Sequence, residues 1–143
     1  MFVSSICRNN LIICKEAMPI ILSNYVKKDE DGDDLFDFER TVPIGNVPDW
    51  YEQRLDKWST TFSGIELTIE ESTIVFSTAS YPPLPIIKKL AGLHKDIGFR
   101  LEYYIIAVAF CGYYTARWGD GEVLVEEKDW KMTDDDYKKL YSL

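Results

Sequence analysis

The order in which strand-like and helix-like segments follow one another constrains the fold of this chain most. Four segments have alternating or unbroken apolar residues and predict strands. Helical segments, with apolar residues three and four positions apart, fall between them. The order strand, helix, strand, strand, helix, strand predicts an α+β fold of the ferredoxin-like class, an antiparallel sheet with helices packed on one face. The predicted strands are 5–14, 65–69, 74–76 and 99–110, and the predicted helices between them are 15–25 and 85–94.

Turn and cap residues add further elements to this outline. Asn46 is expected to cap a helix that begins near Val47. The Trp-Gly-Asp-Gly turn at 118–121 predicts a hairpin that leads into a final strand. Thr133 is the expected N-cap of a short closing helix over 132–141, whose first turn is acidic.

Size and composition favour one folded domain over residues 1–143. The chain has 143 residues, 46% of them hydrophobic, which is enough to bury a core without metals or disulfides. Its formal net charge of -8 disfavours direct contact with nucleic acid or with an anionic membrane. We therefore expect protein partners, basic ones in particular.

The sequence also predicts a cytoplasmic location. No apolar run is long enough to span a membrane, and the charged residues near the N-terminus interrupt any signal-peptide core. Three cysteines, Cys7, Cys14 and Cys111, have no CxxC spacing, which is typical of buried, reduced thiols in a cytoplasm.

Several motifs resemble those of the YubB-like ferredoxin-like domain family, which is found mainly on plasmids and phages. The stretch 6–11, Ile-Cys-Arg-Asn-Asn-Leu, resembles the family's opening strand. Trp50-Tyr51 followed by Arg54 and Trp58 resembles its Trp-Tyr-x-x-Arg-x-x-x-Trp helix. The resemblance implies a ferredoxin-like fold and a gene carried by a mobile element. Further matches are Phe38 to Pro43, Phe76 to Ala79 before Pro82-Pro83, and Phe110-Cys111-Gly112.

Departures from the family pattern fall at polar and aromatic positions. The chain has Ser59-Thr60-Thr61-Phe62 where the family has Gly-Thr-Lys-Trp, so a lysine and a tryptophan are missing. The family's Thr-Ala-Trp-Ser reads Thr78-Ala79-Ser80-Tyr81 here. The framework is kept while positions suited to a common pocket change, so we do not expect this chain to share a family ligand.

The residues do not form a recognisable catalytic or metal-binding motif. His94 is the only histidine, and a structural role near a helix end is expected for it. A Gly-x-Ser-x-Gly elbow and a Cys-His signature are both missing. The acidic stretch 29–34 fails the EF-hand pattern, because its glycine comes two positions early and its twelfth position is Arg40. We expect no enzyme activity, metal or cofactor.

Two groups of residues are the predicted protein-binding site. The acidic stretch supplies an electrostatic contact patch. Aromatic residues near loops and a helix start supply apolar anchors. The predicted site residues are Asp29, Asp31, Asp33, Asp34, Trp50, Trp58 and Tyr81.

The leading functional hypothesis is a non-enzymatic, acidic inhibitor encoded by a phage or plasmid. It would occupy the surface of a host defence component, such as a basic nucleic-acid-binding CRISPR effector, which makes it an anti-CRISPR or other anti-defence protein. A small-ligand protein or enzyme with a pocket near Arg54, Trp58, Thr78 and Tyr81 is the alternative. A third hypothesis is a subunit that associates with itself through a free sheet edge.

Overall fold

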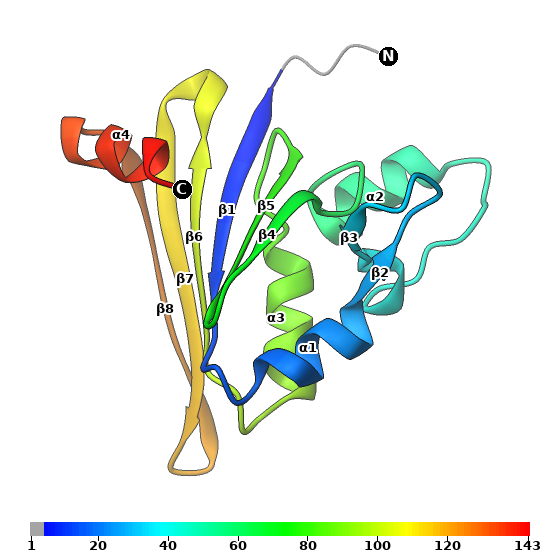
Figure 1. Ribbon diagram of the computed structural model, residues 1–143, viewed down its shortest axis with the longest axis horizontal. Coiled ribbons are helices and arrows are strands. Elements are labelled where there is room, and N and C mark those ends of the chain that lie inside the picture. The colour runs from blue at the N-terminus through cyan, green and yellow to red at the C-terminus, as the bar shows by residue number, and fades with distance from the viewer. Residues whose placement is uncertain (1–4) are drawn as a thin grey trace.

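The computed structural model describes residues 5–143 and has a mixed α+β fold around one antiparallel sheet of six strands (Figure 1). The sheet order is β4-β5-β1-β6-β7-β8, which places β1 next to two strands that follow it much later in the chain. These six strands are β1 (Ile6–Ile12), β4 (Ile65–Ile69), β5 (Thr73–Ala79), β6 (Phe99–Ile105), β7 (Phe110–Gly119) and β8 (Glu122–Lys131). The helices are α1 (Met18–Tyr25), α2 (Trp50–Trp58), α3 (Leu84–Leu93) and α4 (Asp134–Tyr141). The predicted α+β class is confirmed.

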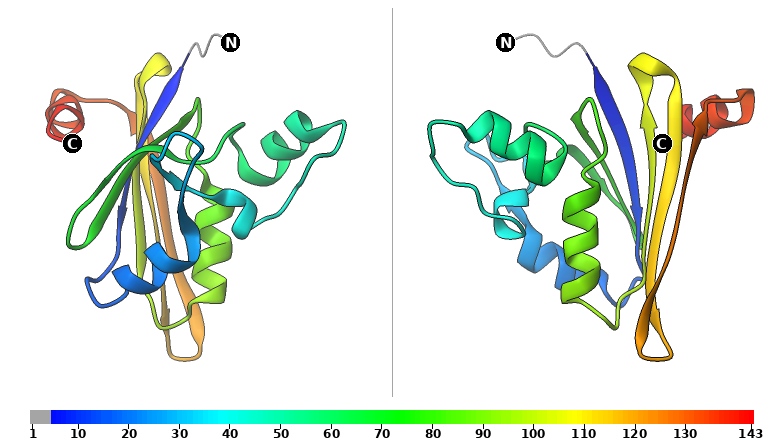
Figure 2. Two further views of the ribbon diagram at one scale, coloured as in Figure 1. Left: turned by 45° about the vertical axis from the view of Figure 1, so that its right-hand side comes forward. Right: turned by 180° about the vertical axis from the view of Figure 1, so that it is seen from behind.

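The helices form two unequal layers. α1, α2 and α3 lie on one side of the sheet, and α4 lies on the other side, beside β7 and β8 (Figure 2). A small hairpin of β2 (Val26–Lys28) and β3 (Asp34–Phe36) follows α1 directly. It joins the large sheet through a bridge between Phe36 and Gly64.

The main core lies between the sheet and helices α1 and α3. Side chains alternate across a strand, so every second residue of β1 and β6 faces this layer. On β1 these residues are Cys7, Asn9 and Leu11, and each is fully buried. Pro19 occupies the first turn of α1, where a missing N–H costs nothing, as the sequence predicts. The helices contribute Met18, Ile21, Tyr25, Ile86, Ile87, Leu90 and Ala91.

A second, smaller core lies under α4 on the opposite face of the sheet. Tyr104 of β6 and Cys111 of β7 are buried there with Met132, and Tyr137 and Leu140 of α4 pack against them. Thr133 caps α4 as predicted, and Asp136 completes a capping box. The predicted closing helix is therefore confirmed.

Two predictions about elements are wrong. The apolar run 105–110 was expected to continue a central strand, but it contains a 3-10 turn, Ile106–Val108, after which the chain reverses into β7. Ala109 makes this reversal with a left-handed backbone, φ 52°. Asn46 does not cap α2, because a turn from Val47 to Trp50 intervenes and the helix begins at Trp50.

The cysteine prediction holds for two of the three thiols. Cys7 and Cys111 are buried and reduced, whereas Cys14 is exposed just after β1 ends. Burial raises the pKa of both Cys7 and Cys111 to about 12. Such thiols stay protonated at neutral pH, which is the opposite of what a nucleophilic cysteine requires.

Candidate protein-binding surface

The acidic stretch 29–34 forms the ordered loop of the β2–β3 hairpin. The Asp29 carboxylate accepts hydrogen bonds from the backbone N–H groups of Asp31 and Asp33, each at 2.9 Å. The Asp29 N–H donates to the Asp33 carbonyl at 2.8 Å. Gly32 takes a left-handed φ of 83°, which closes the turn without a side-chain clash. The loop therefore presents its charges in a fixed arrangement.

The base of this loop is anchored in the core. Phe36, at the end of β3, is fully buried and exchanges two backbone hydrogen bonds with Gly64, at 2.9 and 3.0 Å. Its ring packs on Phe38 and Phe76 at centroid distances of 5.4 and 5.2 Å. A displacement of the loop base would disturb these aromatic contacts.

The four predicted acids have different electrostatic environments. Asp34 pairs with Lys28 at 2.8 Å, and that hydrogen bond raises the pKa of Lys28. Asp31 and Asp33 are exposed, and neither forms an ion pair with another described residue. These two carboxylates are the ones most open to a basic partner.

Glu66 extends the acidic surface across a recess. The recess, of about 590 Å³, lies between the loop and β4 and is lined by Lys28, Asp29, Gly32, Asp33, Asp34, Ile65, Glu66 and Leu67. Glu66 sits at an irregularity in the pairing of β4 with β5 and has a φ of 56°. Sequence reasoning missed Glu66, because alternation alone gives no signal for a bulge.

The predicted aromatic anchors divide into exposed and buried residues. Trp50 and Tyr81 are 43% and 53% exposed, so both can contact a partner. Trp58 is fully buried, and its indole N–H donates to the Val42 carbonyl at 2.9 Å. The assignment of Trp58 as a surface anchor is therefore wrong. Tyr51 and Leu55 are exposed instead, at 46% and 42%.

Arg54 fixes the orientation of the exposed tryptophan. Its guanidinium lies 4.8 Å from the ring centroid of Trp50 and 4.9 Å from that of Trp58. It also donates to the Thr61 carbonyl at 2.8 Å. Stacking between two rings in this way restricts both Arg54 and Trp50, so Trp50 is held ready for contact.

The pocket expected near Arg54, Trp58, Thr78 and Tyr81 does not bring these side chains together as ligand groups. Arg54 and Trp58 are engaged as described above. Thr78 is fully buried and donates its hydroxyl to the Tyr81 carbonyl at 2.7 Å. A neighbouring groove of about 310 Å³ is lined by Leu55, Ser59, Tyr81, Pro82 and Leu84. Its walls are mainly apolar, which suits an apolar side chain better than a polar metabolite.

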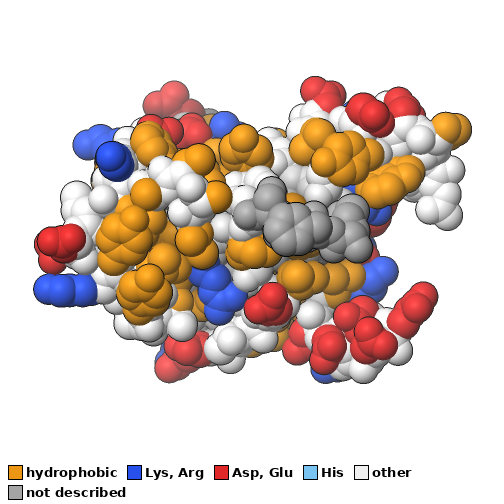
Figure 3. Space-filling model, turned by 90° about the horizontal axis from the view of Figure 1, so that it is seen from above, with side chains coloured by type: hydrophobic (Ala, Val, Ile, Leu, Met, Phe, Trp, Pro, Cys, Tyr) orange, Lys and Arg blue, Asp and Glu red, His pale blue; other side chains and the backbone are white. Residues whose placement is uncertain are grey.

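Acidic and apolar groups meet at one end of the molecule. The β2–β3 loop and α2 both lie at the right-hand end of Figure 1. Seen from above, groups of acidic side chains flank hydrophobic ones at this end (Figure 3). Exposed acids on and before α2 are Asp49, Glu52 and Asp56. We call residues 29–34, Glu66, Trp50, Tyr51, Leu55 and Tyr81 the acidic-aromatic end.

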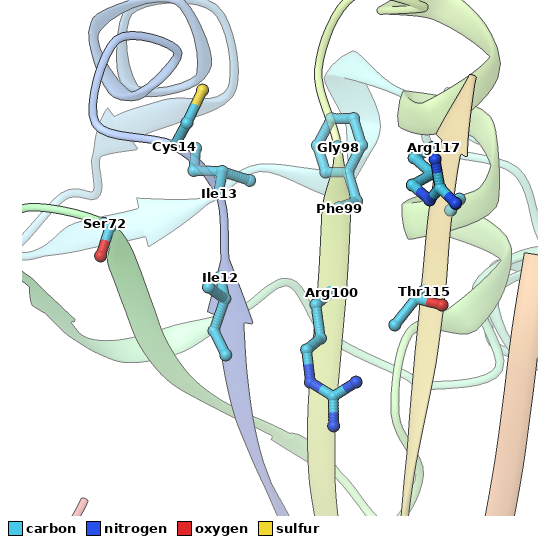
Figure 4. Close-up of a pocket in the computed structure, with 10 residues that line it drawn as sticks. Ile12, Ile13, Cys14, Ser72, Gly98, Phe99, Arg100, Thr115 and Arg117 are labelled. Carbon is cyan, nitrogen blue, oxygen red and sulfur yellow. The ribbon is translucent and has the colours of Figure 1, made fainter. Parts of the chain in front are cut away.

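Another recess, of about 370 Å³, has no comparable combination of groups. It lies where β1 ends and β6 begins, and Arg100 and Arg117 are its charged residues. Figure 4 shows its side chains spread over β1, β6, β7 and the residue before β5, without converging on one point. It contains none of the predicted site residues.

His94, the one histidine of the sequence, follows the last residue of α3. His94 faces Tyr25, whose hydroxyl lies 2.5 Å from its Nε2 in an edge-on ring contact. Within residues 5–143, no three His, Cys, Asp or Glu side chains are grouped to hold a metal ion. Nor does any helix in this part of the chain have the length and apolar character to cross a membrane.

Comparison with known proteins adds no assignment. The chain matches no protein-family model, no curated protein and no solved structure. Its function has to be argued from the surface described above.

Proposed function

We propose that this chain is a non-enzymatic, acidic interaction protein of a phage or plasmid. It acts in the bacterial cytoplasm and inhibits a host defence component, such as a CRISPR effector, by occupying its surface. The observation that carries the proposal is the acidic-aromatic end. There, a rigid loop offers the unpaired carboxylates of Asp31 and Asp33 at the same end of the molecule as α2, which carries the exposed Trp50. Exposed Tyr81 lines a groove together with Leu55 of that helix.

The charge of the molecule supports a basic partner. At a net charge of -8, long-range attraction steers the chain toward positive surfaces and away from nucleic acid itself. Defence complexes that grip DNA or RNA need clustered Lys and Arg to neutralise phosphates. An acidic protein that docks on such a groove competes with the nucleic acid.

The exposed aromatic groups supply the binding affinity that surface charge alone does not provide. Exposed charge pairs contribute little affinity, whereas buried Trp and Tyr anchors dominate interface energies. Arg54 holds Trp50 in place, which lowers the entropy lost on binding. The groove beside Tyr81 can accept an apolar side chain of the partner.

The proposal includes a ferredoxin-like fold and membership of the YubB-like family. If β1, β4, β5 and β6 are taken as first to fourth strands, their spatial order is second, third, first, fourth. Helices α1 and α2 precede the second strand, and α3 connects the third to the fourth. This order supports the proposal, because the split β-α-β units of that fold class have the same order. The association with mobile elements rests on the motif resemblance.

Affinity capture followed by mass spectrometry tests the proposal. The tagged chain is incubated with a bacterial lysate that contains CRISPR and restriction complexes, at low and at moderate salt. We expect one defence protein in stoichiometric amount, bound less at the higher salt because the contact is electrostatic. Inhibition of that complex in a nucleic-acid binding assay must follow. Capture of none of these complexes would contradict the proposal for those targets.

Paired charge reversals locate the contact. Asp31→Lys with Asp33→Lys changes two exposed loop carboxylates, and we expect captured protein to fall at least tenfold. Glu70→Lys with Asp96→Lys is the matched control, because both residues are exposed and lie outside the acidic-aromatic end. It changes the net charge equally and should retain capture. Equal loss in both variants would mean that net charge acts without a defined surface.

A further inference from the structure

β8 is a long, open edge of the sheet. All ten of its residues are exposed, and no other described segment pairs with its outer side. Its pairing with β7 is regular from Phe110↔Lys131 to Gly119↔Glu122, so no bulge interrupts it. We propose that two copies of the chain pair antiparallel through β8 and form one continuous sheet across a twofold axis.

The opposite edge of the sheet is protected in the usual ways. β4 has five residues, an irregular register and a left-handed Glu66. The β2–β3 hairpin also reaches it through Phe36 and Gly64. Short, bulged or covered strands are how monomeric proteins block edge-to-edge pairing. β8 has none of these three devices.

The outward backbone groups of β8 belong to its odd-numbered residues. The β7–β8 turn has two central residues, Asp120 and Gly121, with φ of 52° and 81°, as in a type I′ hairpin. Gly119 and Glu122 then form the first hydrogen-bonded pair, and bonded pairs alternate along the ladder. The bond from Met132 N–H to the Ala109 carbonyl continues this pattern. The residues with outward groups are Val123, Val125, Glu127, Asp129 and Lys131.

The side chains of β8 select one register for a twofold pair. With Glu127 on the axis, Glu126 of each copy faces Lys128 of the other, and Leu124 faces Trp130. These four residues share the sheet face that carries α4, since all are even-numbered. Leu124 and Trp130 are 36% and 37% exposed in the single chain, so the pairing covers apolar surface. Opposite charges and aromatic-aliphatic contacts both stabilise directly opposed pairs.

Neighbouring registers lack this match. An axis at Glu126 places Glu126 opposite itself and Leu124 opposite Lys128. An axis at Lys128 places Lys128 opposite itself and Glu126 opposite Trp130. In the favoured register the like-charged pair is Glu127 with its copy, and Lys88, 3.7 Å from Glu127, offsets that repulsion.

Charge exchange tests the register in solution. Sedimentation equilibrium of the full chain should give twice the chain mass at near-millimolar concentration. Glu126→Lys and Lys128→Glu each turn two attractive pairs into repulsive ones, so each should weaken the dimer about tenfold. The double exchange restores both pairs and should recover most of the affinity. A chain mass throughout would overturn the proposal, and a double variant as weak as the singles would overturn the register.

Disulfide trapping gives an independent test in a Cys14→Ser background, which removes the exposed thiol. Glu127→Cys places two thiols across the axis at a Cα separation of about 5.5 Å, within disulfide range. Val125→Cys is the matched control, because its two copies are displaced by four residues, about 14 Å. Cross-linking of the first variant alone supports the register. Cross-linking of Val125→Cys, or of neither variant, contradicts it.

A backbone variant separates edge pairing from other association. Val125→Pro removes an N–H that points outward, so the ladder with β7 is kept while the dimer loses bonds. We expect a folded monomer. β8 lies at the sheet edge opposite β4 and the acidic loop, so failure here leaves the proposed function untouched.

Discussion

Asn9 shows how one buried polar residue organises three segments. It is fully buried on β1, and its amide donates to Thr78 Oγ1 of β5 at 3.0 Å. Thr78 in turn donates to the Tyr81 carbonyl at 2.7 Å. The chain of bonds links the sheet centre to the turn that carries the exposed Tyr81, so the core determines where this anchor sits.

Thr78→Val tests this link at nearly constant shape. The change leaves the Tyr81 carbonyl without its donor and removes one acceptor of Asn9. Unsatisfied buried groups cost energy, so we expect a loss of about 1–3 kcal/mol in the free energy of unfolding, measured by urea denaturation. Thr68→Val, at an exposed position of β4, is the control and should change stability little. Equal effects at both sites would contradict the link.

Gly64 is required for close packing under the acidic loop. A Cβ built there would lie 2.7 Å from Phe76 Cδ2 and 2.9 Å from Phe36 Cβ. Gly64→Ala should destabilise the chain by about 1–3 kcal/mol, because both neighbours are fully buried. Gly92→Ala on α3 meets nothing within 4 Å and should instead stabilise by about 0.5–1 kcal/mol. Thermal unfolding should show a lower midpoint temperature for Gly64→Ala and a higher one for Gly92→Ala than for the unchanged chain.

The roles of the predicted site residues, in the β2–β3 loop and on α2, could be predicted only in part from the sequence. Charge correctly indicated exposure of Asp31 and Asp33, because unpaired carboxylates rarely enter a core. Trp50 and Trp58 looked equivalent as anchors. Eight positions turn a helix by about 80° beyond two full turns, so the two rings leave on different faces. Which face is buried depends on Phe38 and Val42, which lie outside the helix and contact Trp58.

At the scale of elements, α4 depends on a single capping box. Asp136 accepts hydrogen bonds from Thr133 N–H at 2.8 Å and from Trp130 Nε1–H at 2.8 Å. The Thr133 hydroxyl accepts from the Asp136 N–H. Only Tyr137 and Leu140 of the helix pack against the small core. The cap therefore carries a large share of the stability of α4.

Thr133→Ala should release α4 while the main sheet stays folded. Loss of an N-cap side chain costs about 1 kcal/mol. We expect faster amide exchange over residues 134–141 and little change in β1, measured by hydrogen–deuterium exchange. Ser142→Ala, at the opposite end of the helix, is a control with a smaller expected effect. Slower or unchanged exchange in α4 would contradict this role.

Acid should loosen the same helix. Burial favours the neutral form of Asp136, but bonds from Thr133 and Trp130 outweigh it and hold its pKa below the ordinary 3.8. A carboxyl whose pKa is lower in the folded chain than in the unfolded chain stabilises the fold. That stabilisation is fully present above pH 3.8 and is lost as the pH falls through the pKa of the folded state. The Trp130 indole N–H resonance should shift in that acid range. Asp136→Asn cannot titrate and should remove the shift.

Elements with local signals were predicted better than those defined by distant contacts. Thr133 before an acidic first turn is a local N-cap pattern, and this N-cap was confirmed. The run 105–110 contains neither Gly nor Pro, so nothing in it indicated a reversal. Ile106 and Val108 are 47% and 63% exposed there, contrary to what their apolar character suggests. The turn is set by the pairing of β6 with β7 on either side of it.

At the scale of the whole molecule, the sheet is built from distant segments. β1 pairs with β5, so Cys7 lies opposite Thr78, and with β6, so Cys7 also lies opposite Ile105. Each pairing closes a long loop before its contacts form, and the entropy of closure slows folding. The residue pattern of β1 taken alone specifies neither pairing, because alternation gives a strand its faces but not its neighbours.

This topology predicts slow refolding. Refolding followed by tryptophan fluorescence in a stopped-flow instrument should take on the order of milliseconds to seconds. Leu11→Ala, in the centre of β1, should slow it further if both pairings form in the transition state. Asp96→Ala, on an exposed loop, is the control. Completion in microseconds would contradict the dependence on distant contacts.

The central place of β1 also has a consequence for synthesis on the ribosome. β1 leaves the exit tunnel long before either neighbour, and β6 begins only at Phe99. At typical elongation rates, roughly 5–20 s pass between the two. Both edges of the apolar stretch of β1 are open until β5 has emerged, and one edge stays open until β6 has emerged. Nascent-chain chaperones are therefore expected to bind this stretch first and to leave it once β6 has emerged.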